Sequence, residues 1–257
     1  MIKVHDDQLR RLLPHRELNR KVWDLDSPSS PSLKPEIKDA LLKIANEFYL
    51  FLNIDAPIDD IIFTGSLANF NYTKLSDIDV HVLIDFSKVD ENVDLVRSYM
   101  MSKKSIWNDE HNIFVRGFEV EMYPQDENVT GQLRAAGVYS IVTDEWLSMP
   151  RILNSKIDLC EVKTKAECIM YKIDDVLRST ARLASIDRLK KKIRDMRLSG
   201  LERSGEFSVE NLVFKLLRGN GYIGKLYDAA IKDFDDSLSI KQETILREFI
   251  YESISDV

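Results

Sequence analysis

The chain has 257 residues, 44% of them apolar, and a formal net charge of −7. That length suffices for one large or two modest domains with hydrophobic cores, and the negative charge excludes a globally basic nucleic-acid binder. No uninterrupted apolar stretch approaches the roughly 20 residues of a membrane helix, and the polar N-terminus does not read as a secretory signal. Cys160 and Cys168 suggest neither a zinc site nor a disulfide framework. We therefore expect a cytoplasmic protein with reduced thiols and no membrane partner.

Residues 1–35 read as an N-terminal arm and connector. A short helix is expected over 7–13, and the stretch 26–32 is rich in Ser and Pro, which is typical of turns. Pro35 suits the first turn of a helix, and apolar residues then recur at helical spacing over about 36–53. We expect this helix to pack on the sheet of the domain that follows.

A strand predicted over 61–64 ends in a Gly-Ser turn, Gly65-Ser66. Such a turn can offer backbone N–H groups and a hydroxyl to a phosphate. A short helix expected at 67–70 would direct its positive end to the same place.

A second strand, predicted over 78–84, opens with two carboxylates, Asp77 and Asp79. Because side chains alternate along a strand, both acids point to the same face. Two acids on one side of a rigid strand need a compensating charge, and their hard oxygen atoms suit Mg²⁺. His81 shares this face, where we expect a structural or solvated role, with a hydrogen bond to an acid or a contact with substrate as the alternative.

The next segments continue the first domain. A helix is expected over 89–107, followed by two strand pieces, 113–116 and 118–123, which are joined near Gly117. Pro124 is expected to end the second piece.

The strand predicted over 118–123 carries acids on one face, where Glu119 and Glu121 alternate with apolar residues. Acids on a strand of the same sheet are what a third metal ligand requires. From the residues alone, either acid can be that ligand.

Residues 137–142 are expected to form a further strand, and 146–150 to lead out of the sheet. This places the first domain at 36–150 and an all-helical domain at 151–257. In the second domain, apolar residues form a helical stripe over about 163–196.

Ser199-Gly200 and Ser204-Gly205 are expected to break this helical pattern. Three more helices are predicted, over 208–218, 222–234 and 240–254. The Gly-rich stretch 219–224 lies between two of these helices and does not follow a strand, so we interpret it as a helix–helix turn and not as a dinucleotide-binding loop.

The second domain contains a basic stretch, with nine Lys/Arg and three Asp/Glu between Arg178 and Arg203. One interpretation is a helix face, Arg178–Arg197, that meets a triphosphate or a polyanionic acceptor such as RNA. The alternative is an ordinary solvated helix face.

The spacing of the turn and the acids resembles a known signature. Gly65-Ser66, ten intervening residues and Asp77-x-Asp79 are similar to the motif of the DNA polymerase β-like nucleotidyltransferase superfamily. The resemblance covers about residues 60–125. It implies an α/β (α+β) fold, with a small mixed sheet flanked by helices, here followed by the all-helical domain.

Two further stretches resemble particular branches. Phe-Glu-Val-Glu-Met-Tyr-Pro is similar to the third-acid strand of the oligoadenylate-synthetase branch, which places the third ligand at Glu121 rather than Glu119. Asp-Ile-Asp-Val-His-Val-Leu-Ile-Asp is similar to nucleotidyltransferases predicted in large tailed phages.

The superfamily resemblance implies two-metal nucleotidyl transfer. Asp77 and Asp79 would bridge two Mg²⁺ ions, or Mn²⁺ in their place, and Glu121 would be the third ligand. Gly65 and Ser66 would hold the β- and γ-phosphates of an NTP, with ATP as the expected donor.

The acceptor of the NMP is expected to be a hydroxyl of RNA or of another nucleotide, a choice that the basic stretch Arg178–Arg197 favours. One alternative is an enzyme that modifies a protein or a small molecule, as toxin-like or antibiotic-modifying members do. Another is a non-catalytic nucleotide-binding module that keeps the fold.

Overall fold

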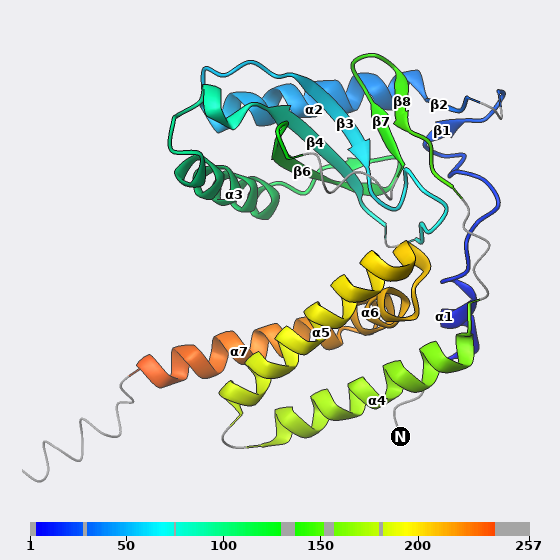
Figure 1. Cartoon of the computed structure of the whole chain (residues 1–257), viewed down its shortest axis with the longest axis vertical. Helices are drawn as coiled ribbons and strands as arrows, with labels where there is room; N and C mark the ends of the chain where they lie inside the picture. The colour runs from blue at the N-terminus through cyan, green and yellow to red at the C-terminus, as the bar shows by residue number, and fades with distance from the viewer. Residues whose placement is uncertain are drawn as a thin grey trace, which may run out of the picture. The chain divides into compact units, whose positions relative to one another are not determined.

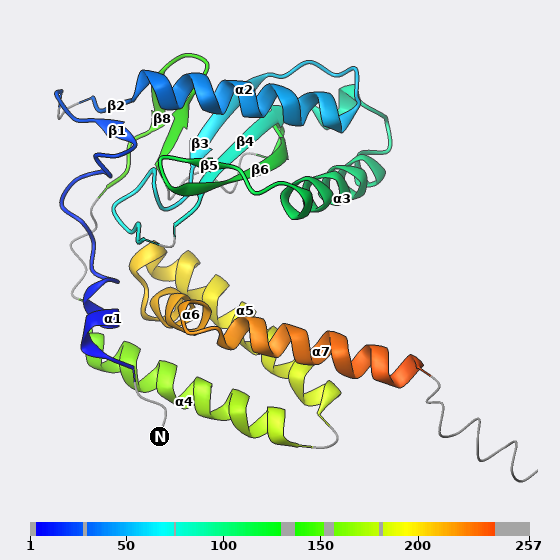
Figure 2. The ribbon, with the colours of Figure 1, turned by 180° about the vertical axis from the view of Figure 1, so that it is seen from behind.

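The computed structural model describes residues 4–27, 30–74, 76–129, 137–151, 157–179 and 182–239. The chain divides into two compact units, whose elements are drawn in Figures 1 and 2. The sheet unit contains Asp6–Ile157 and Ser204–Ser208. The helical unit contains the described residues of Met1–His5, Asp158–Arg203 and Val209–Val257.

The elements follow one another in a simple order. Up to residue 150 they are α1 (Asp6–Arg10), β1 (Trp23–Asp24), β2 (Ser32–Leu33), α2 (Pro35–Leu52), β3 (Asp60–Thr64), β4 (Ile78–Ile84), η1 (Phe86–Lys88), α3 (Val93–Glu110), β5 (Phe114–Val115), β6 (Phe118–Asp126), β7 (Val138–Ser140) and β8 (Glu145–Ser148). Then come α4 (Leu159–Arg178), α5 (Leu183–Ser204), η2 (Gly205–Phe207), α6 (Val209–Gly219) and α7 (Tyr222–Leu238). The predicted class, a mixed sheet with helices followed by a helical part, is confirmed.

The main sheet has six strands in the order β5-β6-β4-β3-β7-β8, and β1 pairs with β2 in a separate two-stranded sheet. β4 and β6 run parallel, whereas the other neighbouring pairs run antiparallel. A parallel pair needs a crossover connection, and here the connection contains α3 and β5. The N-terminal ends of β4 and β6 therefore lie at the same edge of the sheet.

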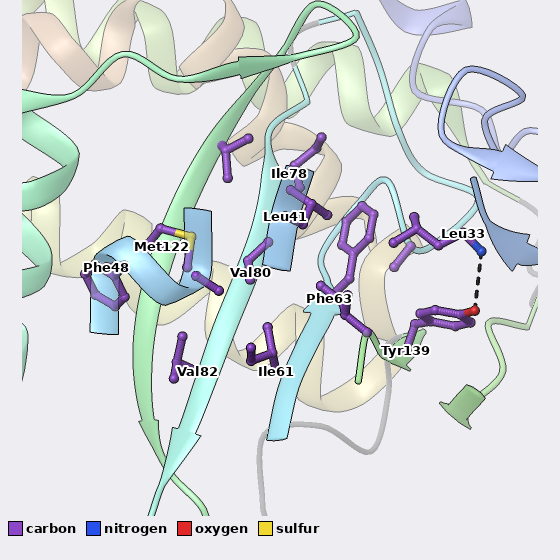
Figure 3. Packing of buried hydrophobic residues seen from close by; sticks show 14 of the residues in the cluster. Leu33, Leu41, Phe48, Ile61, Phe63, Ile78, Val80, Val82, Met122 and Tyr139 are labelled. Atoms are coloured by element: carbon purple, nitrogen blue, oxygen red, sulfur yellow. Dashed lines mark hydrogen bonds between the residues drawn. The ribbon is translucent and has the colours of Figure 1, made fainter. Parts of the chain in front are cut away.

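The two faces of β4 have different surroundings, as the predicted alternation requires. Its fully buried side chains are Ile78, Val80, Val82 and Ile84. They share a core with the fully buried stripe of α2, which consists of Ile37, Leu41, Ala45, Phe48 and Leu52 (Figure 3). The helix predicted over 36–53 and its packing on the sheet are thus confirmed, and removal of this apolar surface from water is what fixes α2 there. The opposite face of β4 carries Asp79 and His81, which are only partly buried.

The N-terminal segment contributes to the same core. Trp23 is 1% exposed, and its indole nitrogen donates to the carbonyl oxygen of Leu67 at 2.7 Å. Leu33 is buried as well, and its N–H donates to the phenol oxygen of Tyr139 at 3.3 Å. These contacts fasten the arm to the loop that follows β3 and to β7.

Two predicted helices differ from the observed ones at their ends. The helix predicted over 7–13 is shorter, as α1 ends at Arg10. The helix predicted from residue 89 begins at Val93, because the side chain of Asn92 caps it by accepting the N–H of Leu95 at 3.2 Å.

Pro124 does not end β6, contrary to prediction; the strand continues to Asp126 and pairs with β4 from Val120 to its end. The hydrogen bonds of Met122, two residues earlier on the same strand, explain why a proline is tolerated here. Met122 exchanges two hydrogen bonds with the side chain of Asn108 in α3, so its backbone polar groups point away from β4. Pro124 lies two residues further on, and its missing N–H therefore also faces that edge, where no ladder bond to β4 is lost.

The short helix predicted at 67–70 is wrong, because the chain makes a turn there. The N–H of Asn69 donates to the carbonyl oxygen of Ser66 at 3.2 Å. The next N–H, of Phe70, donates to the side chain of Asn69, and the Phe70 carbonyl accepts from His15. Local side-chain bonding of this kind competes with helix formation.

The stretch expected to lead out of the sheet contains a further strand, β8, paired antiparallel with β7. The hairpin turn includes Asp144, whose φ of 63° is in the left-handed region and whose carboxylate accepts from the phenol of Tyr139 at 2.5 Å. β8 lies at the sheet edge and lacks a buried alternating face, so periodicity did not reveal it.

The long helical stripe of the second domain is divided between two helices. α4 ends at Arg178, Ser179 is extended, and α5 begins at Leu183. Two shorter helices can each bury a stripe on one core, whereas a single straight helix would run past it. Gly200 lies buried inside α5, so the break predicted at Ser199-Gly200 is wrong, while the break predicted at Ser204-Gly205 is confirmed by η2.

The remaining predictions for the second domain agree with the structure where it is described. α6 and α7 are joined at Gly221, whose φ of 74° is left-handed, so the Gly-rich stretch is the expected helix–helix turn. The helix predicted over 240–254 lies outside the described residues. Cys160 and Cys168 are exposed free thiols on α4. None of the helices in the described ranges combines the length and apolar character needed to span a membrane.

Asn108→Ala tests the account of the β6 edge. The variant would leave the N–H and carbonyl of Met122 without their side-chain partner, so we expect it to lower the free energy of unfolding by about 1–3 kcal/mol. Asn46→Ala is the matched control, because Asn46 is exposed on α2 and alanine is the better helix former. Denaturant unfolding of both variants checks this, and equal stability would contradict it.

Candidate active site

The loop from β3 to β4 brings Gly65 directly against the first acid of β4. Gly65 has a φ of 79°, and a Cβ added there would lie 1.8 Å from Oδ2 of Asp79. Both the backbone conformation and the close approach therefore require glycine. The turn predicted to bind phosphate and the acid predicted to bind metal are thus in contact.

The hydroxyl of Ser66 is held within the same loop. Its Oγ donates to Oγ of Ser76 at 2.7 Å, and Ser76 also accepts the N–H of Thr73 at 2.8 Å. Ser76 is 8% exposed. The loop is therefore closed on itself by a pair of serine hydroxyls, and its start is fixed by the bond from Trp23 to Leu67.

The register of the parallel pair places Asp79 beside Glu121. Asp79 is the Cα partner of Glu121 across β4 and β6, and Thr64 of β3 is its partner on the other side. Neighbouring strands lie about 4.8 Å apart, and matched positions of a parallel pair share a face. Asp77 directly precedes β4, two residues before Asp79, at the same edge of the sheet.

The next positions on this face form an aromatic and polar tier. Tyr123 donates its phenol proton to Oε2 of Glu121. Its ring stacks on the imidazole of His81, with centroids 4.7 Å apart and planes at 17°, while Nζ of Lys104 lies 4.1 Å from the Tyr123 centroid. Nδ1 of His81 lies 2.7 Å from Oε1 of Gln125.

The charges of the acids act on this tier. Burial raises the pKa of Tyr123 well above its usual range, and the hydrogen bond to Glu121 and the negative charges of Asp79, Glu121 and Asp77 raise it further. Burial lowers the pKa of His81, so the imidazole is neutral at pH 7.

The acids suit a hard divalent cation, because such ions prefer carboxylate oxygens as ligands. Asp79 and Glu121 also lie on the same face of adjacent strands. Within the described part of the chain, however, no group of three or more His, Cys, Asp or Glu is arranged to hold a metal ion. One oxygen of Glu121 is engaged by Tyr123. The donor set therefore fits Mg²⁺ in kind, and its assembly into a three-acid site stays a prediction.

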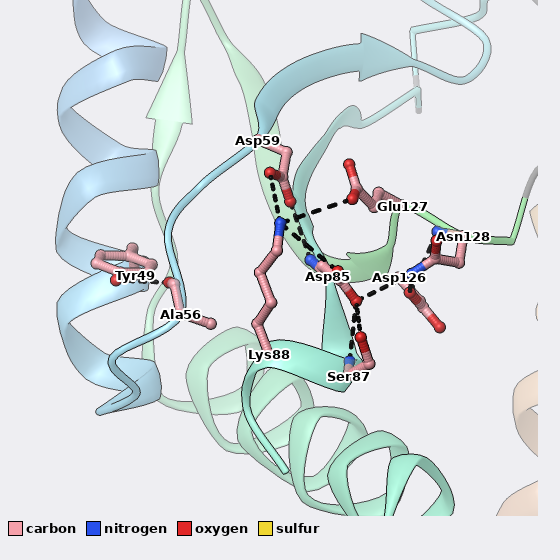
Figure 4. Close-up of polar contacts among 9 residues, drawn as sticks. All are labelled: Tyr49, Ala56, Asp59, Asp85, Ser87, Lys88, Asp126, Glu127 and Asn128. Carbon is pink, nitrogen blue, oxygen red and sulfur yellow. Dashed lines mark hydrogen bonds and ion pairs between the residues drawn. The ribbon is translucent and has the colours of Figure 1, made fainter. Parts of the chain in front are cut away.

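A second group of acids lies at the other end of β4 and has its own cation. Nζ of Lys88 lies 3.6 Å from Asp59, 3.5 Å from Asp85 and 4.0 Å from Glu127 (Figure 4). Asp85 also accepts from Asn128 at 3.0 Å. These acids pair with Lys88 in an ion-pair network at this end of the sheet, so their role is structural.

The comparisons with known proteins add little to this geometry. No protein-family model and no curated protein matches the sequence. Among solved structures, the chain is similar to a STING-associated CdnE c-di-GMP synthase from Capnocytophaga granulosa, with 9% sequence identity and a TM-score of 0.24. The match covers 78% of this chain and 83% of that chain.

The structure brings several of the predicted site residues close together, while their roles stay predictions. Gly65 touches Asp79, and Glu121 is the register partner of Asp79. Glu119 lies two residues before Glu121 on the same face, next to the β5 hairpin, where its Cα partner is Phe114.

Sequence reasoning missed the supporting tier. Tyr123 lies within the predicted strand on the face of Glu121, but the pattern does not say that its phenol bonds to that acid. Gln125 continues the same alternation and was left out because the strand was predicted to end at Pro124. Lys104 comes from α3, and its approach to Tyr123 depends on how the helix packs, which no local pattern encodes.

Parts of the basic stretch are used inside the helical unit. Arg182 donates to both carboxylate oxygens of Asp233, at 2.8 and 2.9 Å, and Lys190 lies 4.5 Å over the ring of Tyr227. The exposed cations of α5 include Arg188, Lys191, Lys192 and Arg194. The basic face is thus smaller than the sequence suggested.

Gly65→Ala tests the close approach in the turn. Strain from the positive φ and the collision with Asp79 should together lower the free energy of unfolding by about 1–3 kcal/mol. Gly219→Ala is the control, because a Cβ there meets nothing within 4 Å. Thermal unfolding of both variants measures this, and a Gly65→Ala variant as stable as the control would refute the geometry.

The pH dependence of stability tests the burial of His81. Its pKa in the folded protein is below the ordinary 6.5, so the unfolded chain binds the proton first as the pH falls. We expect the stability contributed by neutral His81 to be present above pH 6.5 and to be lost progressively below it. Denaturant titrations between pH 7.5 and 5 should show a shallower decline for His81→Asn than for the wild type, and parallel curves would speak against a buried neutral imidazole.

Proposed function

We propose that this chain is a metal-dependent nucleotidyltransferase, which moves an NMP from an NTP to an acceptor hydroxyl. The observation that carries the proposal is the contact of Gly65 with Asp79 at the point where Asp79 pairs with Glu121. A turn suited to phosphate and two acids suited to a cation thereby meet at one edge of the sheet.

Three acids would hold the metal, and the strands would keep their carboxylates in place. Asp77, Asp79 and Glu121 are the residues that would hold Mg²⁺, or Mn²⁺ in its place. When bound, such ions neutralise triphosphate charge and lower the pKa of an acceptor hydroxyl. The rigid strands would keep the carboxylates in fixed positions, so that the cost of ordering them is met on folding and not during the reaction.

The Gly65-Ser66 turn would receive the phosphates. Its backbone approaches Asp79 closely because Gly65 has no Cβ, so a phosphate bound by the N–H groups of the turn would lie near the acids. Ser66 donates to Ser76 in the structure, so a bond from its hydroxyl to phosphate would replace that contact. The expected donor is ATP.

The acceptor we favour is RNA or a nucleotide. The exposed cations of α5, Arg188, Lys191, Lys192 and Arg194, form a basic stretch in an otherwise acidic protein. Cations of this kind contact phosphate without reading sequence, which suits a polyanionic acceptor. A protein or small-molecule acceptor would not need them.

A non-catalytic nucleotide-binding module is the second candidate. It is favoured by one observation, the lack of a three-acid metal group within the described residues. The two candidates differ in whether pyrophosphate is released. A binding module would take up an NTP and Mg²⁺ and release none, whatever acceptor is offered.

The test is incubation of the chain with each α-labelled NTP, total RNA and Mg²⁺ or Mn²⁺, with the label followed into RNA, protein and small products. Asp79→Asn should reduce transfer by about a hundredfold or more, since metal stabilisation is worth several kcal/mol and 1.36 kcal/mol is a factor of ten. Asp94→Asn is the control, because that side chain is 91% exposed on α3.

Three outcomes separate the possibilities. Label in RNA or in a nucleotide product that is lost in Asp79→Asn supports the proposal. Label in protein supports transfer but replaces the acceptor. Nucleotide binding without pyrophosphate release, under all four NTPs and both metals, would overturn the enzyme in favour of the binding module.

A further inference from the structure

Tyr123 is the partner of Glu121 that the sequence did not indicate. Its phenol donates to Oε2 of Glu121, two residues earlier on the same strand and the same face. A carboxylate has two oxygens and several acceptor positions, so this bond fixes the rotamer of Glu121 while leaving the other oxygen available to a cation.

We propose that Tyr123 is a positioning residue, which holds the Glu121 carboxylate in the orientation that a divalent metal ion requires beside Asp79. This inference rests on the proposed function, since it assigns a task to one residue of that same site.

The ring of Tyr123 is itself held from two sides, which is what a positioning residue needs. His81 stacks on the ring, and it is oriented in turn by the contact of its Nδ1 with Gln125 at 2.7 Å. Nζ of Lys104 lies 4.1 Å from the centroid of the same ring, within cation–π range. The phenol oxygen therefore has little freedom to leave Glu121.

The third acid is a glutamate, which explains why its carboxylate needs a residue to position it. A glutamate is one methylene longer than an aspartate and has one more rotatable bond, so its carboxylate loses more freedom when it binds a metal. A hydrogen bond from a rigid phenol restricts that freedom in advance. Partners of metal ligands that act in this way typically change metal affinity by about 10–100-fold when removed.

The experiment compares Tyr123→Phe with Tyr99→Phe. Tyr99 is the matched control, because its phenol also donates one hydrogen bond, to the carbonyl oxygen of Leu52 at 2.7 Å and not to an acid of the site. Calorimetric titration of the full chain with Mn²⁺ gives the affinity, and transfer assays over a range of Mn²⁺ give the concentration required. We expect Tyr123→Phe to weaken Mn²⁺ by about 10–100-fold and Tyr99→Phe to leave it unchanged.

Glu121→Gln supplies the second arm, because a contact that acts through Glu121 cannot matter once its charge is removed. Adding Tyr123→Phe to Glu121→Gln should then change Mn²⁺ affinity by less than about twofold. Thermal unfolding of every variant shows whether loss of stability alone explains a change.

The outcomes distinguish this inference from the proposed function. If the wild type binds Mn²⁺ and transfers nucleotide, but Tyr123→Phe requires no more Mn²⁺ than the wild type, the inference is overturned and the function stands. The same holds if Tyr123→Phe weakens Mn²⁺ equally with and without Glu121→Gln. If the wild type neither binds Mn²⁺ nor releases pyrophosphate, the proposed function fails and takes the inference with it.

Discussion

The parallel pairing of β4 with β6 is the constraint on which the site depends. Its register makes Asp79 and Glu121 neighbours on one face and buries Val80 and Met122 on the other. A slip of one residue would turn every side chain of the strand to the wrong face, so the buried half of the register protects the polar half. The core under α2 therefore fixes the position of the acids as well as stabilising the unit.

The second constraint is the absence of a side chain at Gly65. The chain leaves β3, turns at a positive φ and passes so close to Asp79 that no other residue would fit. Backbone and carboxylate are brought together before any ligand arrives. The free-energy cost of this close approach is offset by buried residues around the loop, which include Trp23 and Leu67. Arrangement before binding is what makes such a site useful in catalysis.

Much of this could be predicted from the sequence because strand alternation is a local property. The faces of β4 and the acids of β6 follow from it, and α2 follows from the helical spacing of its apolar residues, which is equally local. The turn at 67–70 and the edge strand β8 could not be predicted, because each depends on side-chain bonds to Asn69, Tyr139 or Asp144. Gln125 was left out because Pro124 was expected to end the strand, whereas the missing N–H of Pro124 points away from β4, which only the sheet order reveals.

The most direct measurement is anomalous scattering from crystals of the full chain grown with Mn²⁺ and a non-hydrolysable NTP analogue. The account predicts Mn²⁺ peaks within about 2.2 Å of carboxylate oxygens of Asp79 and Glu121, with the triphosphate against Gly65. Peaks confined to the acids around Lys88, or nucleotide bound with no metal near Asp79, would contradict it.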